Sequence, residues 1–203
     1  MKMIIKNTLI LTAITLISGL LLGLVYEITK GPIAASKERA KQEAYENVLP
    51  GAENFELFSD FNHKTVKSLL NEHGYDSCSL DEVIVAKAKD KTVGYIVTST
   101  STEGYGGDIQ IAVGFLKDGT INGISILSIS ETVGLGMKAK EPEFYKQYMG
   151  KKVEQFDIVK ANAKELSEID AISGATVTSE AVTDAVNVAV VYYNEVLGGV
   201  GLE

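Results

Sequence analysis

Hydrophobic residues are distributed unevenly along the chain, and the longest apolar run comes first. Residues 7–26 form 20 consecutive uncharged positions, most of them aliphatic. At about 1.5 Å of rise per helical residue, this run would extend roughly 30 Å, the thickness of a bilayer core. A secretory signal has only about 7 to 15 apolar residues and needs a cleavage site, which the following residues do not offer. We therefore predict a membrane anchor over residues 1–30, with a cleaved signal or a buried core helix as alternatives.

The pattern then changes to a charged helical stretch followed by a less regular one. Gly31 and Pro32 are expected to interrupt the first helix. Residues 33–48 are rich in Ala, Glu, Lys and Gln, which predicts a stalk-like helix that a Leu-Pro-Gly sequence ends. The next residues have scattered aromatic side chains and no sustained period, with one helical stretch expected near 65–71. We describe 31–80 as a stalk helix and an irregular segment.

The second half of the chain begins with four runs rich in β-branched residues. These runs are expected to form two hairpins, because short polar segments separate the members of each pair. Asp118 and Gly119 supply the positive φ angle of a tight reversal in the second hairpin. We therefore predict four antiparallel strands, over residues 83–88, 93–100, 109–115 and 120–129.

Two helices are predicted after the strands. Residues 141–149 indicate a short helix with Pro142 in its first turn. Between 182 and 196, apolar residues recur at steps of three and four, which is typical of an amphipathic helix whose apolar face covers a sheet. Strands followed by helices, without βαβ alternation, predict an α+β domain over 81–203 behind a single transmembrane helix.

Charge and composition exclude several classes of function. The formal net charge is −8, and because Lys2 and Lys6 are the only charged residues among the first 26, the remainder carries −10. A nucleic-acid surface needs clustered Lys and Arg, which the sequence lacks, so no nucleic-acid partner is expected. Cys78, His63 and His73 are too few for a zinc or iron–sulfur site and form no nucleophile and base arrangement. We assign no metal ligand and no catalytic residue.

Three segments combine small, hydroxyl-bearing and glycine residues, namely 99–107, 130–138 and 170–179. Each has a structural explanation, because glycine permits turns and Ser or Thr before a helix is an ordinary N-cap. Three such loops in one small domain could nevertheless meet at one edge. Loops without bulk allow a flat ligand to approach the backbone, and a helix N-terminus favours a phosphate. Together they indicate a planar, phosphorylated ligand.

The third segment contains the sequence Asp170-Ala171-Ile172-Ser173-Gly174-Ala175-Thr176. It resembles the flavinylation sequence, Asp-x-x-Ser/Thr-Gly-Ala-Thr, of the FMN-binding domain family shared by the G subunit of the Rnf electron transport complex and the C subunit of the sodium-translocating NADH:quinone reductase. The resemblance implies that the hydroxyl of Thr176 carries FMN through a phosphodiester bond. A dedicated flavin transferase would install it, and Asp170 would help that transferase recognise the segment.

The other two segments are similar to the family's remaining signature loops. Gly104-Tyr105-Gly106-Gly107 precedes a strand, and Glu131-Thr132-Val133-Gly134-Leu135-Gly136 follows one; Val133 stands where the family usually has Pro. Thr132 and Thr178 are candidate hydrogen-bond donors to the ring or ribityl chain, and Tyr105 could stack on the ring or pack on the hairpin. The residues implied to bind FMN are Thr176, Ser173, Gly174, Ala175, Thr178, Gly104, Tyr105, Gly106, Gly107, Glu131, Thr132, Gly134, Leu135 and Gly136.

The resemblance also implies a function and a place in the cell. We expect a membrane-anchored flavoprotein subunit of an ion-translocating electron transport complex, which relays electrons between ferredoxin and NAD through covalent FMN. Its partners would be the other complex subunits, the flavin transferase and membrane lipid, with the folded domain on the extracytoplasmic side of the cell membrane. The alternatives are the C subunit of a sodium-translocating NADH:quinone reductase, an anchored FMN-binding or sensor module without electron relay, and an unmodified scaffold subunit.

Overall fold

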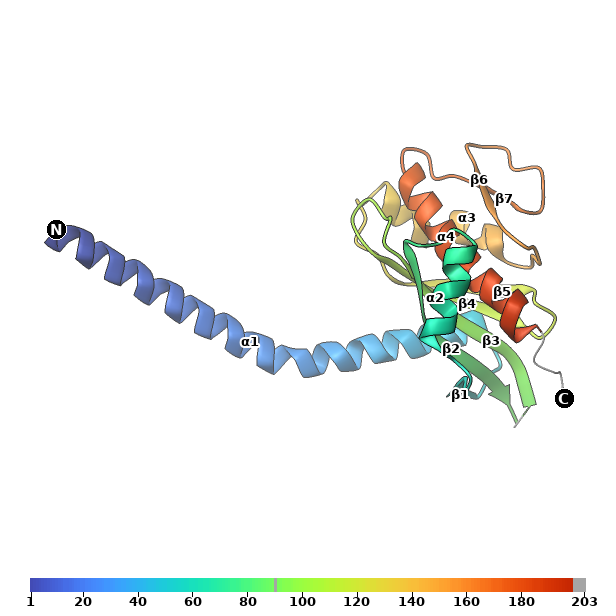
Figure 1. Ribbon diagram of the computed structural model, residues 1–203, viewed down its shortest axis with the longest axis horizontal. Coiled ribbons are helices and arrows are strands. Elements are labelled where there is room, and N and C mark those ends of the chain that lie inside the picture. Colours follow the sequence, from blue (N-terminus) through green and yellow to red (C-terminus); the bar gives the residue numbers. More distant parts are fainter. Residues whose placement is uncertain (90, 199–203) are drawn as a thin grey trace. The chain divides into compact units, whose positions relative to one another are not determined.

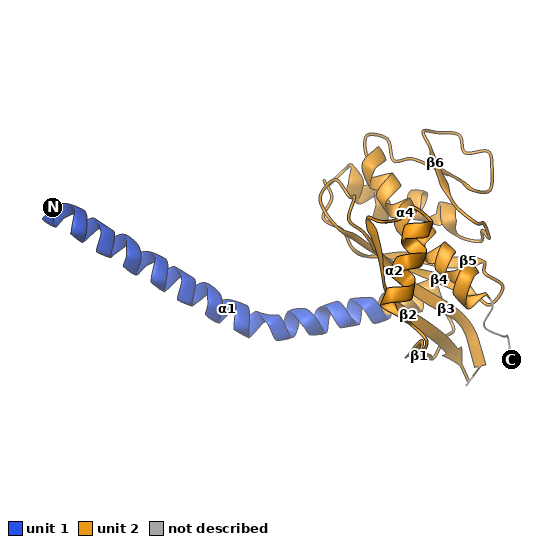
Figure 2. Cartoon of the chain, viewed as in Figure 1, with its two compact units in different colours: residues 1–42 blue, residues 43–203 orange. Residues whose placement is uncertain are grey.

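A computed structural model of the chain describes residues 1–89 and 91–198. It divides into two compact units, Met1–Gln42 and Glu43–Glu203 (Figure 2). The compact unit begins at residue 43, whereas we expected the FMN-binding domain over 81–203; that domain boundary stays a prediction. Within the described residues, one helix is long and apolar enough to cross a membrane, and its apolar side chains are exposed.

This helix, α1, runs without interruption from Lys2 to Val48. The expected interruption at Gly31 and Pro32 is wrong, because both residues lie inside the helix. Proline removes only one backbone donor from the helix. The strong helix formers that follow Pro32 continue the helix to its predicted end before Leu49.

The second unit contains an antiparallel sheet of five strands in the order β1-β2-β3-β4-β5. The expected number of four was wrong, because β1 lies in the segment that we expected to be irregular and pairs with β2. A strand of four residues is too short to show a hydrophobic alternation in the sequence. The strands are β1 (Asn54–Leu57), β2 (Cys78–Ala88), β3 (Lys91–Ser101), β4 (Ile109–Leu116) and β5 (Ile121–Ser128).

One face of the sheet is covered by α4 (Thr176–Tyr192), which continues as the π-helical turn η3 (Tyr193–Leu197). The helix α2 (His63–Glu72) packs beside α4 and against β2 (Figure 1). Nearly the whole surface of α4 is buried in the main core, together with apolar side chains of β2, β3 and β4. The prediction that the last helix covers the sheet is therefore confirmed, although the helix begins at Thr176 rather than near 182.

The chain between the sheet and α4 forms short elements. The single helix expected over 141–149 is wrong, because this segment is divided between one α-helical turn and a 3-10 helix. In so short a segment, the few helical hydrogen bonds do not offset the free-energy cost of nucleating a helix, so its conformation depends on tertiary contacts. The elements are η1 (Gly136–Lys140), α3 (Pro142–Tyr145), η2 (Lys146–Tyr148) and the parallel strands β6 (Asp157–Val159) and β7 (Glu168–Asp170).

The opposite face of the sheet receives the last turn of α1. A Cβ atom added to Gly114 would lie 2.7 Å from the carbonyl oxygen of Val48, and one added to Gly123 would lie 3.1 Å from its Cα atom. The side chain of Asn122 donates a hydrogen bond to the same carbonyl at 2.8 Å. We call this contact the glycine notch, defined by Val48, Gly114, Asn122 and Gly123. The fold as a whole is α+β, as predicted.

Candidate functional site

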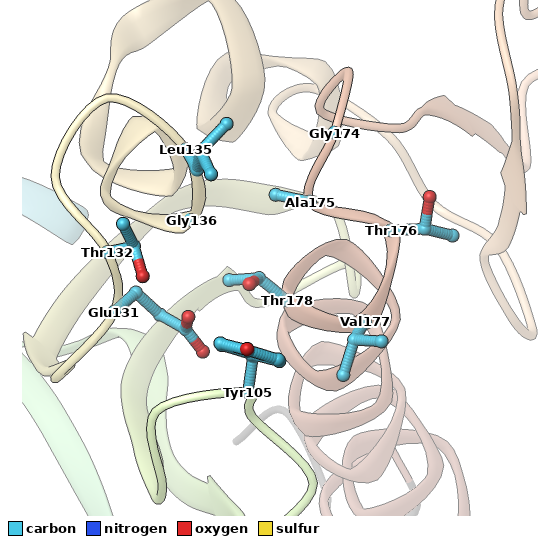
Figure 3. A pocket seen from close by; sticks show the side chains of 10 residues that line it. All are labelled: Tyr105, Glu131, Thr132, Leu135, Gly136, Gly174, Ala175, Thr176, Val177 and Thr178. Atoms are coloured by element: carbon cyan, nitrogen blue, oxygen red, sulfur yellow. The ribbon is translucent and has the colours of Figure 1, made fainter.

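Three loops meet at one end of the sheet and enclose a cavity of about 560 Å³. The first connects β3 to β4, the second connects β5 to η1, and the third connects β7 to α4. The cavity volume lies within the range of roughly 300–1,000 Å³ that is typical of ligand pockets. We call it the loop pocket (Figure 3); its lining residues are Tyr105, Glu131, Thr132, Leu135, Gly136, Gly174, Ala175, Thr176, Val177 and Thr178.

The first and second loops touch through backbone and carboxylate groups. The N–H of Gly106 donates a hydrogen bond to Oε1 of Glu131 at 3.2 Å. A Cβ atom at Gly106 would lie 2.1 Å from the carbonyl oxygen of Ser130, a distance that no side chain permits. Glycine is therefore required at position 106 for these two loops to approach each other.

The second loop is folded tightly on itself and opens directly into η1. The carbonyl oxygen of Thr132 accepts hydrogen bonds from the N–H groups of Leu135 and Met137, at 3.1 and 3.2 Å. A Cβ atom at Gly136 would lie 2.6 Å from Oγ1 of Thr178. The absence of a side chain at Gly136 thus lets the second loop contact the first turn of α4.

A buried serine holds the third loop against α4. The hydroxyl of Ser179 accepts a hydrogen bond from the N–H of Ile172 and donates one to the carbonyl oxygen of Ala175, both at 2.9 Å. Ala175 is the N-cap residue, and no side chain caps the helix. In the described chain, the N–H groups of residues 176–178, which form the first turn of the helix, donate no hydrogen bond to a backbone carbonyl. The start of α4 therefore offers free donors toward an anion.

The two threonines of this first turn differ in accessibility. Thr176 is exposed, whereas Thr178 is 1% exposed. In Figure 3, the side chain of Thr178 faces the space between the loops, and that of Thr176 projects from the outer side of the chain. Of these two hydroxyls, only that of Thr176 is open to a modifying enzyme.

The remaining residues of the predicted site lie close to the pocket without lining it. Ser173, Gly107 and Gly134 are exposed on the three loops, and the N–H of Gly107 donates to the carbonyl oxygen of Gly104 in a tight turn, at 3.2 Å. These residues shape the loops, and their role toward FMN stays a prediction.

Asp170 is held in place at the end of β7. Its carboxylate accepts a hydrogen bond from the N–H of Ala163 at 2.8 Å, and its own N–H donates to the side chain of Gln147 at 2.7 Å. Asp170 is half-buried and fixes the start of the third loop. Its recognition by a transferase stays a prediction.

Sequence reasoning missed two residues of this region. Val177 lines the pocket and is exposed, and Ser179 fixes the third loop. Val177 could have been included from the sequence, because it directly follows Thr176 in the third segment. Nothing in the sequence distinguishes Ser179 from an ordinary helix-initiating serine, because its partners become neighbours only in the folded loop.

Acidic side chains of α4 and of the first loop lie close enough to influence one another. Burial raises the pKa of Asp184 to about 6, and the neighbouring carboxylates of Glu103 and Glu180 contribute to this rise. Glu103 belongs to the first loop, and Glu180 lies one turn after Thr176 on α4. No Lys or Arg is among the described residues that line the pocket, so a phosphate there would depend on the helix N-terminus rather than on a basic side chain.

Two protein families match this chain, one over its first residues and one over most of its second half. Residues 1–48 match the family described as the RnfG N-terminal region, and residues 104–191 match the FMN-binding domain. The G subunit of the Na⁺-translocating ferredoxin:NAD⁺ oxidoreductase complex of Acetobacterium woodii is 37% identical over 195 residues, which cover 95% of this chain and 92% of that protein. The chain belongs to the RnfG family.

Two further G subunits agree with this assignment, and one solved structure is similar over part of the chain. The G subunit of the proton-translocating ferredoxin:NAD⁺ oxidoreductase complex of Clostridium ljungdahlii is 33% identical, with coverage of 93% of this chain and 91% of that protein. The G subunit of the ion-translocating oxidoreductase complex of Methanosarcina acetivorans is 31% identical, with coverage of 94% and 95%. The crystal structure of Shewanella oneidensis NqrC overlaps 56% of this chain and 57% of its own, with a TM-score of 0.47 and 22% identity.

Proposed function

We propose that this chain is the G subunit of an Rnf-type, ion-translocating electron transport complex, and that it passes electrons between ferredoxin and NAD through FMN attached to Thr176. Membership of the RnfG family and the match to the FMN-binding domain support this function. The names of its relatives in Acetobacterium and Clostridium supply the donor and acceptor pair. α1 is the membrane anchor.

The observation that carries the attachment site is the geometry at the start of α4. Thr176 is exposed and belongs to the first turn, where residues 176–178 have free N–H groups. A phosphate esterified to the Thr176 hydroxyl would be next to these donors and to the positive end of the helix dipole. The small residues Gly174 and Ala175 leave room for a transferase to approach.

The loop pocket fits a flat ring beside that phosphate. Tyr105, Leu135 and Val177 present exposed apolar surface around it, while Gly174 adds no side chain to the wall. Bound FMN would supply one- and two-electron redox chemistry. The protein residues orient the ring, limit the access of water and determine how closely a redox partner approaches.

We place the folded unit on the extracytoplasmic side of the cell membrane, where the other complex subunits, the flavin transferase and membrane lipid are its partners. A tether keeps the flavin at high effective concentration, so the protein need not recapture it from a compartment that lacks free FMN. Covalent attachment is therefore most useful outside the cytoplasm. Labelling of a cysteine introduced in the exposed first loop, with a membrane-impermeant reagent on intact cells, tests this placement.

Substitution of the acceptor tests the proposed function. Thr176→Ala and Thr178→Ala are each expressed with a flavin transferase and compared with the unchanged chain by intact mass and by in-gel flavin fluorescence after denaturation. We expect Thr176→Ala alone to lack the added mass of one FMN less water. The proposal then requires that complexes containing Thr176→Ala lose electron transfer from ferredoxin to NAD; unchanged transfer would contradict the relay.

A further inference from the structure

Glu131 is a buried carboxylate at the centre of the three loops. Only 8% of its surface is exposed, although it lines the loop pocket. Its Oε1 accepts the hydrogen bond from the N–H of Gly106 and lies 3.0 Å from the position of a Cβ atom added to Gly104. In Figure 3 the carboxylate points into the space between the second loop, Tyr105 and Thr178.

The other carboxylate oxygen faces the second loop and α4. A Cβ atom at Gly136 would lie 2.7 Å from Oε2 of Glu131 and 2.6 Å from Oγ1 of Thr178. The side chain of Glu131 therefore occupies the space that Gly104 and Gly136 leave open. It joins the first and second loops at the wall of the pocket, next to the start of α4.

No basic side chain pairs with Glu131 among the described residues. Within residues 1–89 and 91–198, the one hydrogen-bond donor to this carboxylate is the N–H of Gly106. Tyr105 is the other titratable side chain that lines the pocket. A buried negative charge acts strongly on its surroundings, because the protein interior screens it much less than water does.

We propose that Glu131 is a positioning residue with two effects: it ties the first loop to the second, and its charge makes the loop pocket disfavour negative charge on a reduced flavin. A bound flavin that takes up two electrons from the redox partner of the proposed function would be anionic with one added proton and neutral with a second proton from water. The carboxylate opposes the anion and so favours the oxidised and the neutral reduced forms. The effect on the flavin rests on the proposed function; the tie between the loops does not.

Glu131→Gln separates the two effects, since a glutamine carbonyl can still accept the hydrogen bond from Gly106 while the charge is absent. The full-length, flavin-loaded protein is titrated spectroelectrochemically at pH 8, with Glu103→Gln as the control because Glu103 is an exposed acid of the first loop. We expect a midpoint potential at least about 30 mV more positive in Glu131→Gln, equivalent to a tenfold change in a two-electron equilibrium. In Glu103→Gln we expect a much smaller shift, because solvent screens an exposed charge. An equal potential in Glu131→Gln and the unchanged chain would overturn the charge effect.

Glu131→Ala removes the hydrogen bond as well as the charge. Measured on protein without flavin, its melting temperature should fall below that of Glu131→Gln, and the first loop should exchange its amide hydrogens faster. Equal melting temperatures and equal exchange in the two variants would overturn the tie between the loops. If the unchanged chain accepts no flavin, the proposed function fails, but these measurements on flavin-free protein still test the tie.

Discussion

The glycine notch and the loop pocket lie in the same unit, and both depend on glycines that leave space beside the backbone. In the notch, the space at Gly114 and Gly123 is filled by the chain itself, namely by Val48 at the end of α1. In the pocket, Glu131 and Thr178 fill the space at Gly136, so the loops approach each other there, and a cavity stays open between the three loops. The missing side chains therefore allow internal packing at the notch, and at the pocket they allow the loops to approach closely around a cavity.

The two sites also differ in whether their large apolar side chains are buried or exposed. In the notch, Val48 belongs to a cluster of buried apolar side chains, and the side chain of Asn122 donates a hydrogen bond to its carbonyl oxygen. Around the pocket, large apolar side chains stay in solvent: Tyr105 is 78% exposed and Val133 is 86% exposed. Apolar surface that folding does not bury is available for binding. The comparison predicts that substitutions at the notch change stability and that substitutions at the pocket change flavin content.

The largest expected effect is at the acceptor. Thr176→Ala should abolish covalent flavin completely while changing the free energy of unfolding by less than about 0.5 kcal/mol, since the residue is exposed. Denaturant unfolding in detergent and in-gel fluorescence give the two quantities. Retained covalent flavin, or a large loss of stability, would break the contrast between the two sites.

Gly114→Ala should have the opposite result: a loss of stability with unchanged flavin attachment. The added Cβ atom would approach the carbonyl oxygen of Val48 to 2.7 Å, so the backbone must shift, at a cost of about 1–3 kcal/mol. Flavin attachment should be unaffected in the fraction that folds, as judged by the ratio of flavin to protein. A variant with full stability would show that the notch tolerates bulk and is not tightly packed.

Asp184→Asn gives a smaller and pH-dependent effect. The pKa of Asp184 is raised to about 6 from an ordinary value near 3.8, so its ionisation opposes folding. The favourable contribution of the protonated acid is complete below pH 3.8 and is lost as the pH rises through about 6. Because the side chain is partly exposed, we expect the variant to be about 1 kcal/mol more stable than the unchanged chain at pH 7.5 and nearly equal at pH 4. A difference that does not depend on pH between these values would contradict the account.

Val133→Pro should have the smallest effect. The N–H of Val133 makes no hydrogen bond to the backbone in the described chain, and its φ angle is not positive. Proline at such a position restricts the unfolded chain and adds about 0.4–1 kcal/mol of stability. Thermal unfolding measures this gain, and flavin content should be unchanged. A loss of stability would show that the second loop needs a conformation that proline excludes.

Much of the architecture could be predicted from the sequence because its signals are local. The apolar run at 7–26 and the steps of three and four after residue 182 each reflect one element and its solvent exposure. The strand β1 and the short helices around α3 could not be predicted in this way. Their stability comes from tertiary contacts, such as the pairing of β1 with β2, rather than from a local hydrophobic period.

The candidate site was predictable to a similar degree. The glycine and hydroxyl segments indicated three loops, and the structure brings residues of all three to one cavity. The sequence did not show that Thr178 is buried while Thr176 is exposed, or that Ser179 bonds to the third loop. These properties depend on where α4 begins and on which chain segments meet it, and both are set by the folded structure.

The central claim is that one hydroxyl, that of Thr176, carries the flavin. No Lys or Arg lies between residues 165 and 203, so a single tryptic peptide contains Ser173, Thr176 and Thr178. Fragmentation of this peptide, from protein matured with a flavin transferase, locates the added mass on a single residue. The account predicts FMN less water on Thr176 and none on the other two residues. An unmodified peptide, or FMN on Ser173 or Thr178, would contradict it.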